Sequence, residues 1–441
     1  MYRKVIQKEC FEAQKNASSV ELSTIGSDRF PYARTMRNFI RKLLLLLALF
    51  LPYTVSAQNA FIAPEIRPYV EFIQNTNTSS VDYIMGLFEK FDVVVLGERD
   101  HRDTTQYLLI QQIISDPRFI DKVGNVLTEV GVYNMRYELN RVLQADYQNN
   151  FEFEKALAEV NFNLQWLPLW EKSNYIQFQR DIYNVNNNLP THQKINLYPT
   201  DIQYSWIHNR NITAEEYRLF FNALEYRDFV MGYNAIDALH KIFAEPRKKA
   251  LVIYNMPHSS KFYEDKEGYN HFAYQVIADH FPGRVANVAL NWCILPGFNE
   301  DYEGLTNEGK WDAAFAVNGN KSIGFDLAGT IFGDDIFDMH PFVERHAYKD
   351  VFHGFIFYTP ASEWAARIGV PIFRHLDKSY VREELARRYQ IFQGLSDIAE
   401  EFKDQLYEYA ISSFLINIAE SQEGLLQLFN SQMEQWYKPN R

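Results

Sequence analysis

The segment Asp92-Val93-Val94-Val95-Leu96-Gly97-Glu98-Arg99-Asp100-His101 indicates how the chain folds. Its first five residues form the continuous apolar run that is typical of a strand buried on both faces, and Gly97 ends that run. Residues 104–115 then show helical periodicity up to Asp116-Pro117. This succession predicts a strand, a polar loop and a covering helix, which together begin a parallel β-α-β unit.

The same alternation continues along the chain. Helical stretches follow at 134–147, 151–187 with a break at Pro168, 213–243 and 268–280. Further short apolar runs, each predicted to be a strand, lie at 123–128, 195–198, 250–254, 284–290, 322–327 and 354–358. We therefore predict an α/β fold with a mostly parallel β-sheet, covered by helices on both faces.

The remainder of the chain is predicted to be helical. Residues 381–437 have few strand signals, and the Gly394-Leu395-Ser396 stretch predicts a break between helices. Apolar residues from Leu406 to Leu428 recur at three-to-four spacing, which predicts a helix pair packed on the sheet. We expect an α/β domain at 58–380 and an additional helical C-terminal region at 381–441.

The N-terminal part predicts export. Residues 36–42 are a short basic segment, 43–51 are almost all leucine, and Val55 and Ala57 are small residues at the spacing that signal peptidase recognises. The apolar run is short for a membrane-spanning helix, which needs roughly 20 apolar residues, although an N-terminal anchor is the alternative. We interpret 36–57 as a cleaved signal peptide, 1–35 as an upstream extension that is not native, and the mature protein as periplasmic, with no transmembrane domain.

Composition narrows the function classes. The net charge of −12 argues against binding to nucleic acid or to an anionic membrane surface. Only Cys293 follows the predicted cleavage site, so an internal disulfide is excluded, and its apolar neighbours predict a small buried side chain and not a nucleophile. Aromatic residues make up 16% of the chain, which predicts a large core.

Acids and histidines follow four consecutive predicted strands. In chain order they are Glu98 and His101, then Glu129, then Asp201, and then Asn255 and His258. Because parallel strands end at one edge of a sheet, where open α/β folds bind ligands, we predict a shared polar site there. Asp326, at the end of the sixth predicted strand, is a further candidate for a supporting residue next to this site.

Two kinds of chemistry use such residues. A histidine oriented by a carboxylate can act as a general base on water. The same four side chains, Glu98, His101, Glu129 and His258, could equally be ligands of Zn²⁺ or Mn²⁺. The Glu-x-x-His spacing lets both side chains face one centre if the segment is helical. Neither a Gly-x-Ser-x-Gly motif nor a glycine-rich phosphate loop is present.

The motifs resemble those of the erythromycin esterase-like family, which belongs to a wider group with the Tiki proteases and the haem-binding uptake proteins. The matching segments follow the family's order: 97–101 resembles the Gly-Glu-x-x-His signature, 127–131 the second-strand motif, 198–203 the Gly-x-Asp-x-Gln segment, 255–258 the Asn-x-x-His motif and 352–360 the closing strand.

The resemblance implies a hydrolase of an ester, lactone or amide that activates water. By carry-over, His101 would be the general base, Glu98 and Glu129 would orient it and the water, and His258 would stabilise the oxyanion or protonate the leaving group. Asp201 and Asn255 would support them, as Asp326 could. The substrate would be a small molecule or peptide, and no cofactor would be required.

Two alternatives remain open at this point. The resemblance also allows a haem- or metal-binding uptake protein, for which Tyr107 would be the haem-ligand candidate, and a catalytically inactive member that binds a ligand. In the Tiki-like branch the same residues would hold a divalent metal for peptide hydrolysis. The sequence indicates no oligomeric state.

Overall fold

A computed structural model describes residues 60–168, 170, 173–261, 272–295, 303–339 and 346–439. One compact unit spans Asn59–Arg441. The predicted upstream extension at 1–35 and the predicted signal peptide at 36–57 lie outside the described residues. Within the described ranges, the helices are all too short or too polar to cross a bilayer.

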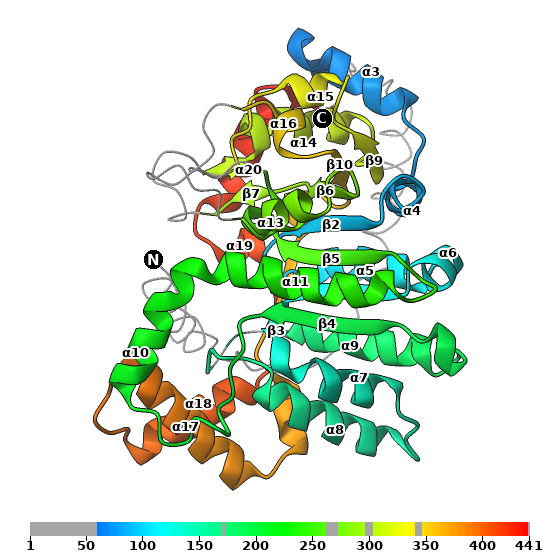
Figure 1. Ribbon diagram of the computed structural model, residues 1–441. Coiled ribbons are helices and arrows are strands. Elements are labelled where there is room, and N and C mark those ends of the chain that lie inside the picture. The colour runs from blue at the N-terminus through cyan, green and yellow to red at the C-terminus, as the bar shows by residue number, and fades with distance from the viewer. Residues whose placement is uncertain are drawn as a thin grey trace, which may run out of the picture. The chain divides into compact units, whose positions relative to one another are not determined.

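The centre of the unit is a seven-stranded sheet in the order β4-β3-β5-β2-β6-β10-β9 (Figure 1). Every paired strand is parallel to its neighbour except β9, which runs antiparallel to β10. All seven predicted strands are confirmed and all belong to this sheet. They are β2 Val93–Glu98, β3 Asn125–Val132, β4 Asn196–Asp201, β5 Ala250–Asn255, β6 Val285–Leu290, β9 Ile323–Asp326 and β10 Gly354–Phe357.

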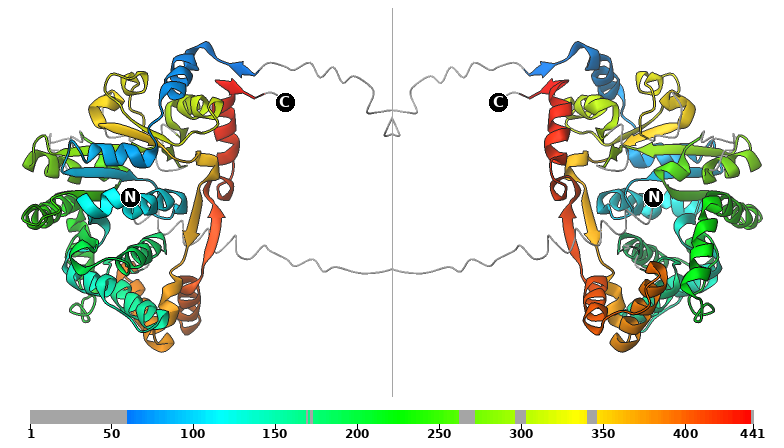
Figure 2. Two further views of the ribbon diagram at one scale, coloured as in Figure 1. Left: turned by 90° about the vertical axis from the view of Figure 1, so that its right-hand side faces the viewer. Right: turned by 90° about the vertical axis from the view of Figure 1, so that its left-hand side faces the viewer.

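Helices cover both faces of the sheet (Figure 2). On β2, Val94 and Leu96 join the core of one face, while Val93 and Val95 join the core of the other, because successive side chains of a strand point to opposite faces. The first face is covered by α5 Thr104–Ser115, α6 Pro117–Lys122, α7 Arg136–Gln144, α8 Asn150–Asn163 and α9 Ser173–Asn186, and the second by α11 Arg227–Phe243 and α13 Ala273–His280. The predicted α/β class is confirmed.

The helices end where proline residues predicted their boundaries. Asp103 caps α5, since its carboxylate accepts a hydrogen bond from the Thr105 N–H, and α5 ends before Asp116-Pro117. The break predicted at Pro168 is also confirmed, because α8 ends at Asn163 and α9 begins at Ser173. The predicted helix at 213–243 consists of α10 Ala214–Asn222, a short 3-10 turn and α11.

The C-terminal region departs from the prediction in one place. α17 Lys378–Gln393 ends at Gly394, whose φ of 69° is left-handed, and α18 Glu400–Ile411 follows. The helix pair predicted from Leu406 to Leu428 is wrong at 414–417, because these residues form β12 and pair with β11 Ala365–Ile368. The short helices α19 Ile418–Ser421 and α20 Leu425–Glu434 complete the region. The three apolar residues Phe414, Leu415 and Ile416 fit either period, and pairing with a distant strand decided the outcome.

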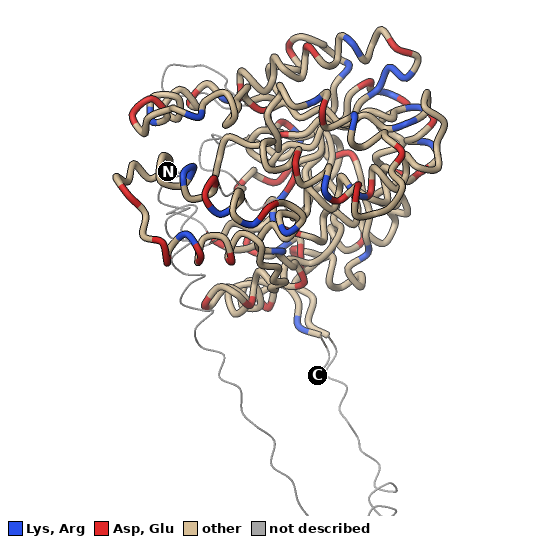
Figure 3. Tube along the Cα trace, turned by 90° about the horizontal axis from the view of Figure 1, so that it is seen from below, with Lys and Arg blue, Asp and Glu red and all other residues tan. Residues whose placement is uncertain are grey.

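Charged residues are distributed along the whole unit. Seen from below, acidic and basic residues alternate along the described chain without a basic stripe on that side (Figure 3). This distribution agrees with the net charge of −12.

Candidate functional site

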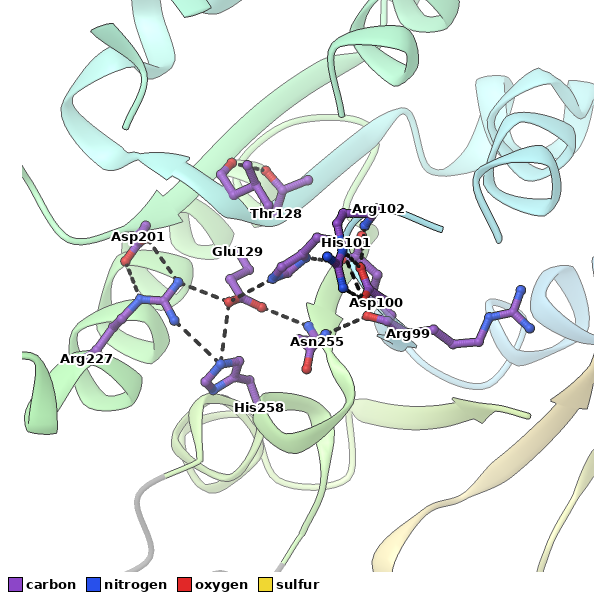
Figure 4. A network of polar contacts seen from close by, with 12 residues as sticks. Arg99, Asp100, His101, Arg102, Thr128, Glu129, Asp201, Arg227, Asn255 and His258 are labelled. Atoms are coloured by element: carbon purple, nitrogen blue, oxygen red, sulfur yellow. Dashed lines mark hydrogen bonds and ion pairs between the residues drawn. The ribbon is translucent and has the colours of Figure 1, made fainter. Parts of the chain in front are cut away.

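Strand register brings the predicted site residues to one edge of the sheet (Figure 4). Glu98, the last residue of β2, lies opposite Asn255, the last residue of β5. Thr128 of β3 lies opposite Ile253 of β5. Glu129, the next residue of β3, is therefore one residue closer to the carboxyl end of the sheet. Asp201 is the last residue of β4. The carboxyl ends of β2, β3, β4 and β5 therefore supply the site together.

A turn, and not the helix considered above, brings Glu98 and His101 together. The Asp103 N–H donates to the Asp100 carbonyl, and His101 Nδ1 lies 2.8 Å from Glu98 Oε2. The Tyr107 hydroxyl, on α5, donates to Glu98 Oε1 at 2.6 Å. Both oxygens of this buried carboxylate are therefore held, and the imidazole is oriented by it.

Gly97 is required by close packing behind this turn. A Cβ at this position would lie 2.8 Å from Ser259 Oγ and 3.2 Å from the Val288 carbonyl oxygen. Ser259 belongs to α12 Met256–Ser259, the short helix that carries His258. The glycine thus lets His258 approach the end of β2.

His258 repeats the arrangement of His101. Its Nδ1 lies 2.8 Å and 2.9 Å from the two carboxylate oxygens of Asp228, in the first turn of α11. Its Nε2 lies 3.4 Å from Glu129 Oε1, and His101 Nε2 lies 3.6 Å from the same oxygen. Two imidazoles, each backed by its own carboxylate, therefore converge on one oxygen atom of Glu129.

Arg227 fixes the far side of Glu129. One guanidinium nitrogen, Nη2, donates to Glu129 Oε1 at 3.0 Å, and Arg227 Nε donates to Asp201 Oδ1 at 2.8 Å. The Trp166 indole N–H donates to Asp201 Oδ2 at 2.9 Å, and the backbone N–H of Asn255 donates to Glu129 Oε2 at 2.9 Å. Asp201 and Asn255 thus position Arg227 and Glu129, as supporting residues should.

Electrostatics follow from these contacts. Burial disfavours the charged form of His101, but Glu98 and Glu129 outweigh it and raise the pKa of His101 well above its ordinary value. Burial opposes the charge of His258 as well, yet Asp228 and Glu129 raise its pKa, against a lowering contribution from Arg227. For Glu129, His258, Arg227 and His101 outweigh burial and hold its pKa well below the usual range. Glu129 is thus the central anion, with His101, His258 and Arg227 around it and with Glu98, Asp228 and Asp201 paired behind these three.

The remaining charges of the signature are paired away from this centre. Arg99 is buried, its Nε lies 2.9 Å from Asp103 Oδ2, and its guanidinium covers the Trp364 ring at 4.1 Å. Asp100 is paired with Arg102 at 2.6 Å. The Arg99-Asp100 dipeptide therefore builds the loop beside the site.

Asp326 is not part of the site. Because β9 runs antiparallel to β10, its last residue lies opposite Gly354, the first residue of β10, at the other end of the sheet. There Asp326 accepts a hydrogen bond from Tyr83 and lies 3.8 Å from Lys90. The prediction that it supports the site is wrong, since it assumed a parallel sixth strand.

Sequence reasoning missed Arg227 and Asp228, and it named Tyr107 only as a haem-ligand candidate. Arg227 and Asp228 are adjacent in a long helical stretch, where a charged pair is typical of solvated surface. No strand end marks them, and only the packing of α11 across the sheet brings them to Glu129 and His258. In the sequence they lie in the middle of the helix predicted at 213–243, and only the structure begins α11 at Arg227.

The four candidate metal ligands do not fit a divalent cation as they stand. Both Nδ1 atoms face carboxylates, and the guanidinium of Arg227 occupies the Glu129 oxygen on which both Nε2 atoms converge. Accordingly, no group of three or more His, Cys, Asp or Glu side chains among the described residues is arranged to hold a metal.

Comparison with known proteins gives no family. No family model matches the chain, and no curated protein matches it. Among solved structures it is similar to a Bacillus cereus protein (13% identity, 74% of this chain and 97% of that one, TM-score 0.40) and to a succinoglycan biosynthesis protein (11%, 67% and 93%, 0.38). It is also similar to ChaN of Campylobacter jejuni, a structure with cofacially bound haem (14%, 47% and 84%, 0.29). Similarities at these TM-scores carry no argument about function.

Proposed function

We propose that this protein is an exported hydrolase that uses the His101–Glu129–His258 centre to add water across an ester, lactone or amide bond. The observation that supports the proposal is the convergence of two carboxylate-backed imidazoles on one oxygen of Glu129. One imidazole can take a proton from water while the other gives a proton to the leaving group, which is general acid–base catalysis.

The reactive atoms are the two Nε2 nitrogens. The Nδ1 contacts to Glu98 and Asp228 are 2.8 Å, whereas the Nε2 contacts to Glu129 are 3.4 Å and 3.6 Å. Short bonds on Nδ1 fix the orientation of each ring, and the longer contacts leave Nε2 free to exchange its partner for water or substrate. The side chains of His101 and His258 keep 19% and 12% exposure, so both can be reached.

The contacts distinguish the two histidines. Each histidine has a carboxylate at both ring nitrogens, and for His101 these contacts favour two N–H donors and a retained proton. His258 Nε2 also faces Arg227 Nη1 at 3.5 Å, and a guanidinium can only donate, so it favours a lone pair at Nε2. We therefore propose His258 as the base and His101 as the proton donor, the reverse of the roles that the resemblance implies.

Each proton in the proposed reaction has a donor and an acceptor. His258 Nε2 takes a proton from water, and the oxygen of that water forms a bond to the carbonyl carbon. As the bond to the leaving oxygen or nitrogen breaks, His101 Nε2–H gives its proton to that atom. Glu129 keeps both imidazoles facing the centre, and Arg227 keeps Glu129 in place.

The test compares histidine variants of the chain from Gln58 onward against 4-nitrophenyl esters, lactones and short peptides. Exchanging either His101 or His258 for Asn should reduce kcat/KM by about 10²- to 10⁴-fold without loss of folding. His240→Asn is the matched control, because His240 is exposed near the C-terminal end of α11 and its contacts among the described residues are with His280 and Phe281.

Two results would contradict the proposal. Full turnover in either site variant would remove that residue from the mechanism, and an inactive wild-type protein across the panel would exclude these substrate classes. A Soret band, or stoichiometric manganese or zinc that disappears in the Glu98→Ala/His101→Ala double variant, would favour a binding protein or metallohydrolase in its place.

A further inference from the structure

Two exposed histidines meet where α11 and α13 end. His240 lies in the last turn of α11, His280 is the last residue of α13, and both are exposed. Their Nε2 atoms are 3.0 Å apart, and their ring centroids are 5.1 Å apart with the planes at 85°. Because a neutral imidazole carries one N–H and one lone pair, one ring of a neutral pair donates this hydrogen bond and the other accepts it.

The two helices that carry the pair are packed closely together. α11 and α13 lie side by side on one face of the sheet, where their apolar side chains share one core (Figure 1). At Gly232 of α11, an added Cβ would lie 2.6 Å from the Cβ of Val276 of α13. At the opposite end of the helix pair, the Ala273 N–H donates to Asp228 at 2.9 Å. The distance between the two histidines is therefore set by packed helices and not by loops.

One aromatic side chain supports both imidazoles. The buried Phe281 ring lies 5.3 Å from the His240 ring and 4.7 Å from the His280 ring, in both cases edge to face. Phe281 in turn packs against Phe243 at 5.1 Å. Because both histidine rings rest on a buried residue, they lose less conformational entropy when they bind a common ligand.

The spacing of the two nitrogens matches that of two ligands of one transition-metal ion. An imidazole nitrogen binds Zn²⁺ at about 2.0–2.1 Å, so two such nitrogens are about 2.9 Å apart at an angle of 90° and about 3.3 Å apart at the tetrahedral angle. The observed 3.0 Å lies between these values. A bound ion lies beside the line that joins the nitrogens, and two exposed side chains can make the small turn that this position requires.

The local charges also favour a cation. Both histidines lie at the C-terminal ends of their helices, where the helix dipoles place partial negative charge. Two basic residues are close by, Lys241 next in the chain and Arg284 over the Phe281 ring. Both are paired, because Lys241 lies 2.7 Å from Asp237 and Arg284 lies 2.6 Å from Asp92.

We infer that His240 and His280 together bind one divalent transition-metal ion of the class that imidazole ligands suit, such as Zn²⁺, Ni²⁺ or Cu²⁺. Each Nε2 gives its lone pair to the ion, two waters leave the hydrated ion, and the ring that donated the hydrogen bond moves its proton to Nδ1 through water. Among the described residues no third His, Cys, Asp or Glu completes a group with them, so water supplies the remaining ligands.

The inference does not depend on the proposed hydrolase. α11 begins at Arg227, in the candidate centre, and His240 lies 13 residues later in the same helix, which is about 20 Å along its axis. The ion would join the C-terminal ends of two helices and would be too far from His101 and His258 to take part in hydrolysis. Either proposal can therefore fail without the other.

The deciding experiment is a copper titration. Cu²⁺ is bound most tightly among the divalent first-row metals and gives an electron paramagnetic resonance signal. Copper(II) chloride is added at neutral pH to the chain from Gln58 onward, purified without a histidine tag. We expect one equivalent to bind saturably, with hyperfine structure from two nitrogens, and Zn²⁺ to compete for the same site. His240→Asn and His280→Asn should each weaken binding at least about tenfold, since even the loss of an outer-shell contact to a ligand costs that much.

Two control variants locate the ion. His208→Asn changes an exposed histidine in the loop after β4, and the Glu98→Ala/His101→Ala double variant changes the candidate centre. Both should bind copper as the wild type does. Binding that survives in both His240→Asn and His280→Asn would overturn the inference. Binding that is lost in the double variant would also overturn it and would place the ion in the candidate centre.

A second measurement tests whether the ion joins the two helices. With saturating Zn²⁺ the wild type should unfold at a higher temperature, because an ion that binds the folded state alone stabilises it. The shift should disappear in His280→Asn and remain in His208→Asn. An equal shift in His280→Asn would show that Zn²⁺ acts elsewhere, against the inference.

Discussion

One oxygen atom, Oε1 of Glu129, organises the candidate site. It lies within 3.6 Å of His101, His258 and Arg227, and each of these has its own carboxylate partner elsewhere. His258, Arg227 and His101 keep Glu129 ionised, and Glu129 in turn raises the pKa of both imidazoles. At the residue scale, the protonation of the two histidines is therefore the property most open to test.

Glu98 contacts Nδ1 of His101 and Asp228 contacts Nδ1 of His258. Removing the charge of one or the other should shift a different limb of the pH profile of kcat/KM. Activity requires neutral His258 and protonated His101, so kcat/KM should rise with pH through the pKa of His258, which Asp228 and Glu129 raise, and fall through the pKa of His101, which Glu98 and Glu129 raise. Asp228→Asn removes a charge that raises the pKa of His258, so the rising limb should move to lower pH. Glu98→Gln should move the falling limb to lower pH.

These two variants are each other's control. If Asp228→Asn shifts the falling limb and Glu98→Gln the rising one, His101 is the base after all. The profile should be recorded as kcat/KM, since that ratio reports the free protein.

Gln165 also predicts an unusual stability effect, because its buried amide makes no hydrogen bond in the described part of the chain. Gln165→Leu replaces an unpaired buried amide by an apolar side chain of similar size, so the free energy of unfolding should rise by about 1 kcal/mol. Gln179→Leu removes both hydrogen bonds that Gln179 exchanges with Asn161 in the core and should lower the free energy of unfolding by about 1–3 kcal/mol. Urea unfolding measures both, and a loss of stability in Gln165→Leu would mean that the amide has a structural partner.

At the scale of elements, the contact between β2 and α12 controls the geometry of the site. Gly97→Ala would place a Cβ 2.8 Å from Ser259 Oγ and 3.2 Å from a backbone oxygen of β6. The Ser259 hydroxyl is fully buried and donates to the Met256 carbonyl, so it cannot simply turn away, and α12 should move and displace His258. We expect a loss of about 1–3 kcal/mol of stability together with a loss of activity.

Gly86→Ala is the matched control for Gly97→Ala. Gly86 lies in α4 Ser80–Leu87, where an added methyl group would meet no other atom within 4 Å, and Ala favours a helix over Gly by about 1 kcal/mol. Thermal unfolding should show a gain for Gly86→Ala. Equal stability and activity in Gly97→Ala would show that α12 accommodates the methyl group.

The elements differ in how far sequence could predict them. The seven strands of the sheet were predicted because each is a short apolar run with a polar boundary. β12 was not, because Phe414–Asn417 continues a helical spacing and pairs with β11, almost fifty residues earlier in the chain. The spacing of apolar residues also does not indicate the direction of a strand. The antiparallel direction of β9, which sets the position of Asp326, was therefore not predicted.

At the scale of the whole molecule, buried charge sets the pH dependence of stability. Asp312, buried in α14 Lys310–Val317, has its pKa raised to about 7 by burial. Its carboxyl therefore keeps its proton in the folded state at pH values where the unfolded chain has released it. As pH rises from about 4 to about 7, this group makes folding progressively less favourable.

Asp312→Asn removes that dependence. Relative to wild type, the variant should gain a few kcal/mol in the free energy of unfolding between about pH 4 and pH 7, and no more above that range. Chemical unfolding at several pH values measures the difference. A difference that does not change with pH would mean that Asp312 is ionised in the folded protein.

The α/β class and the seven strands of the sheet followed from the amino-acid sequence. Of the seven site residues that it predicted, six meet at one edge of that sheet. Strand ends are local features, and parallel strands place their carboxyl ends together whatever the connections between them. Tertiary structure alone decided which residues complete the site. Arg227 and Asp228 belong to a helix that packs across the sheet, so their roles depend on packing that no local pattern encodes.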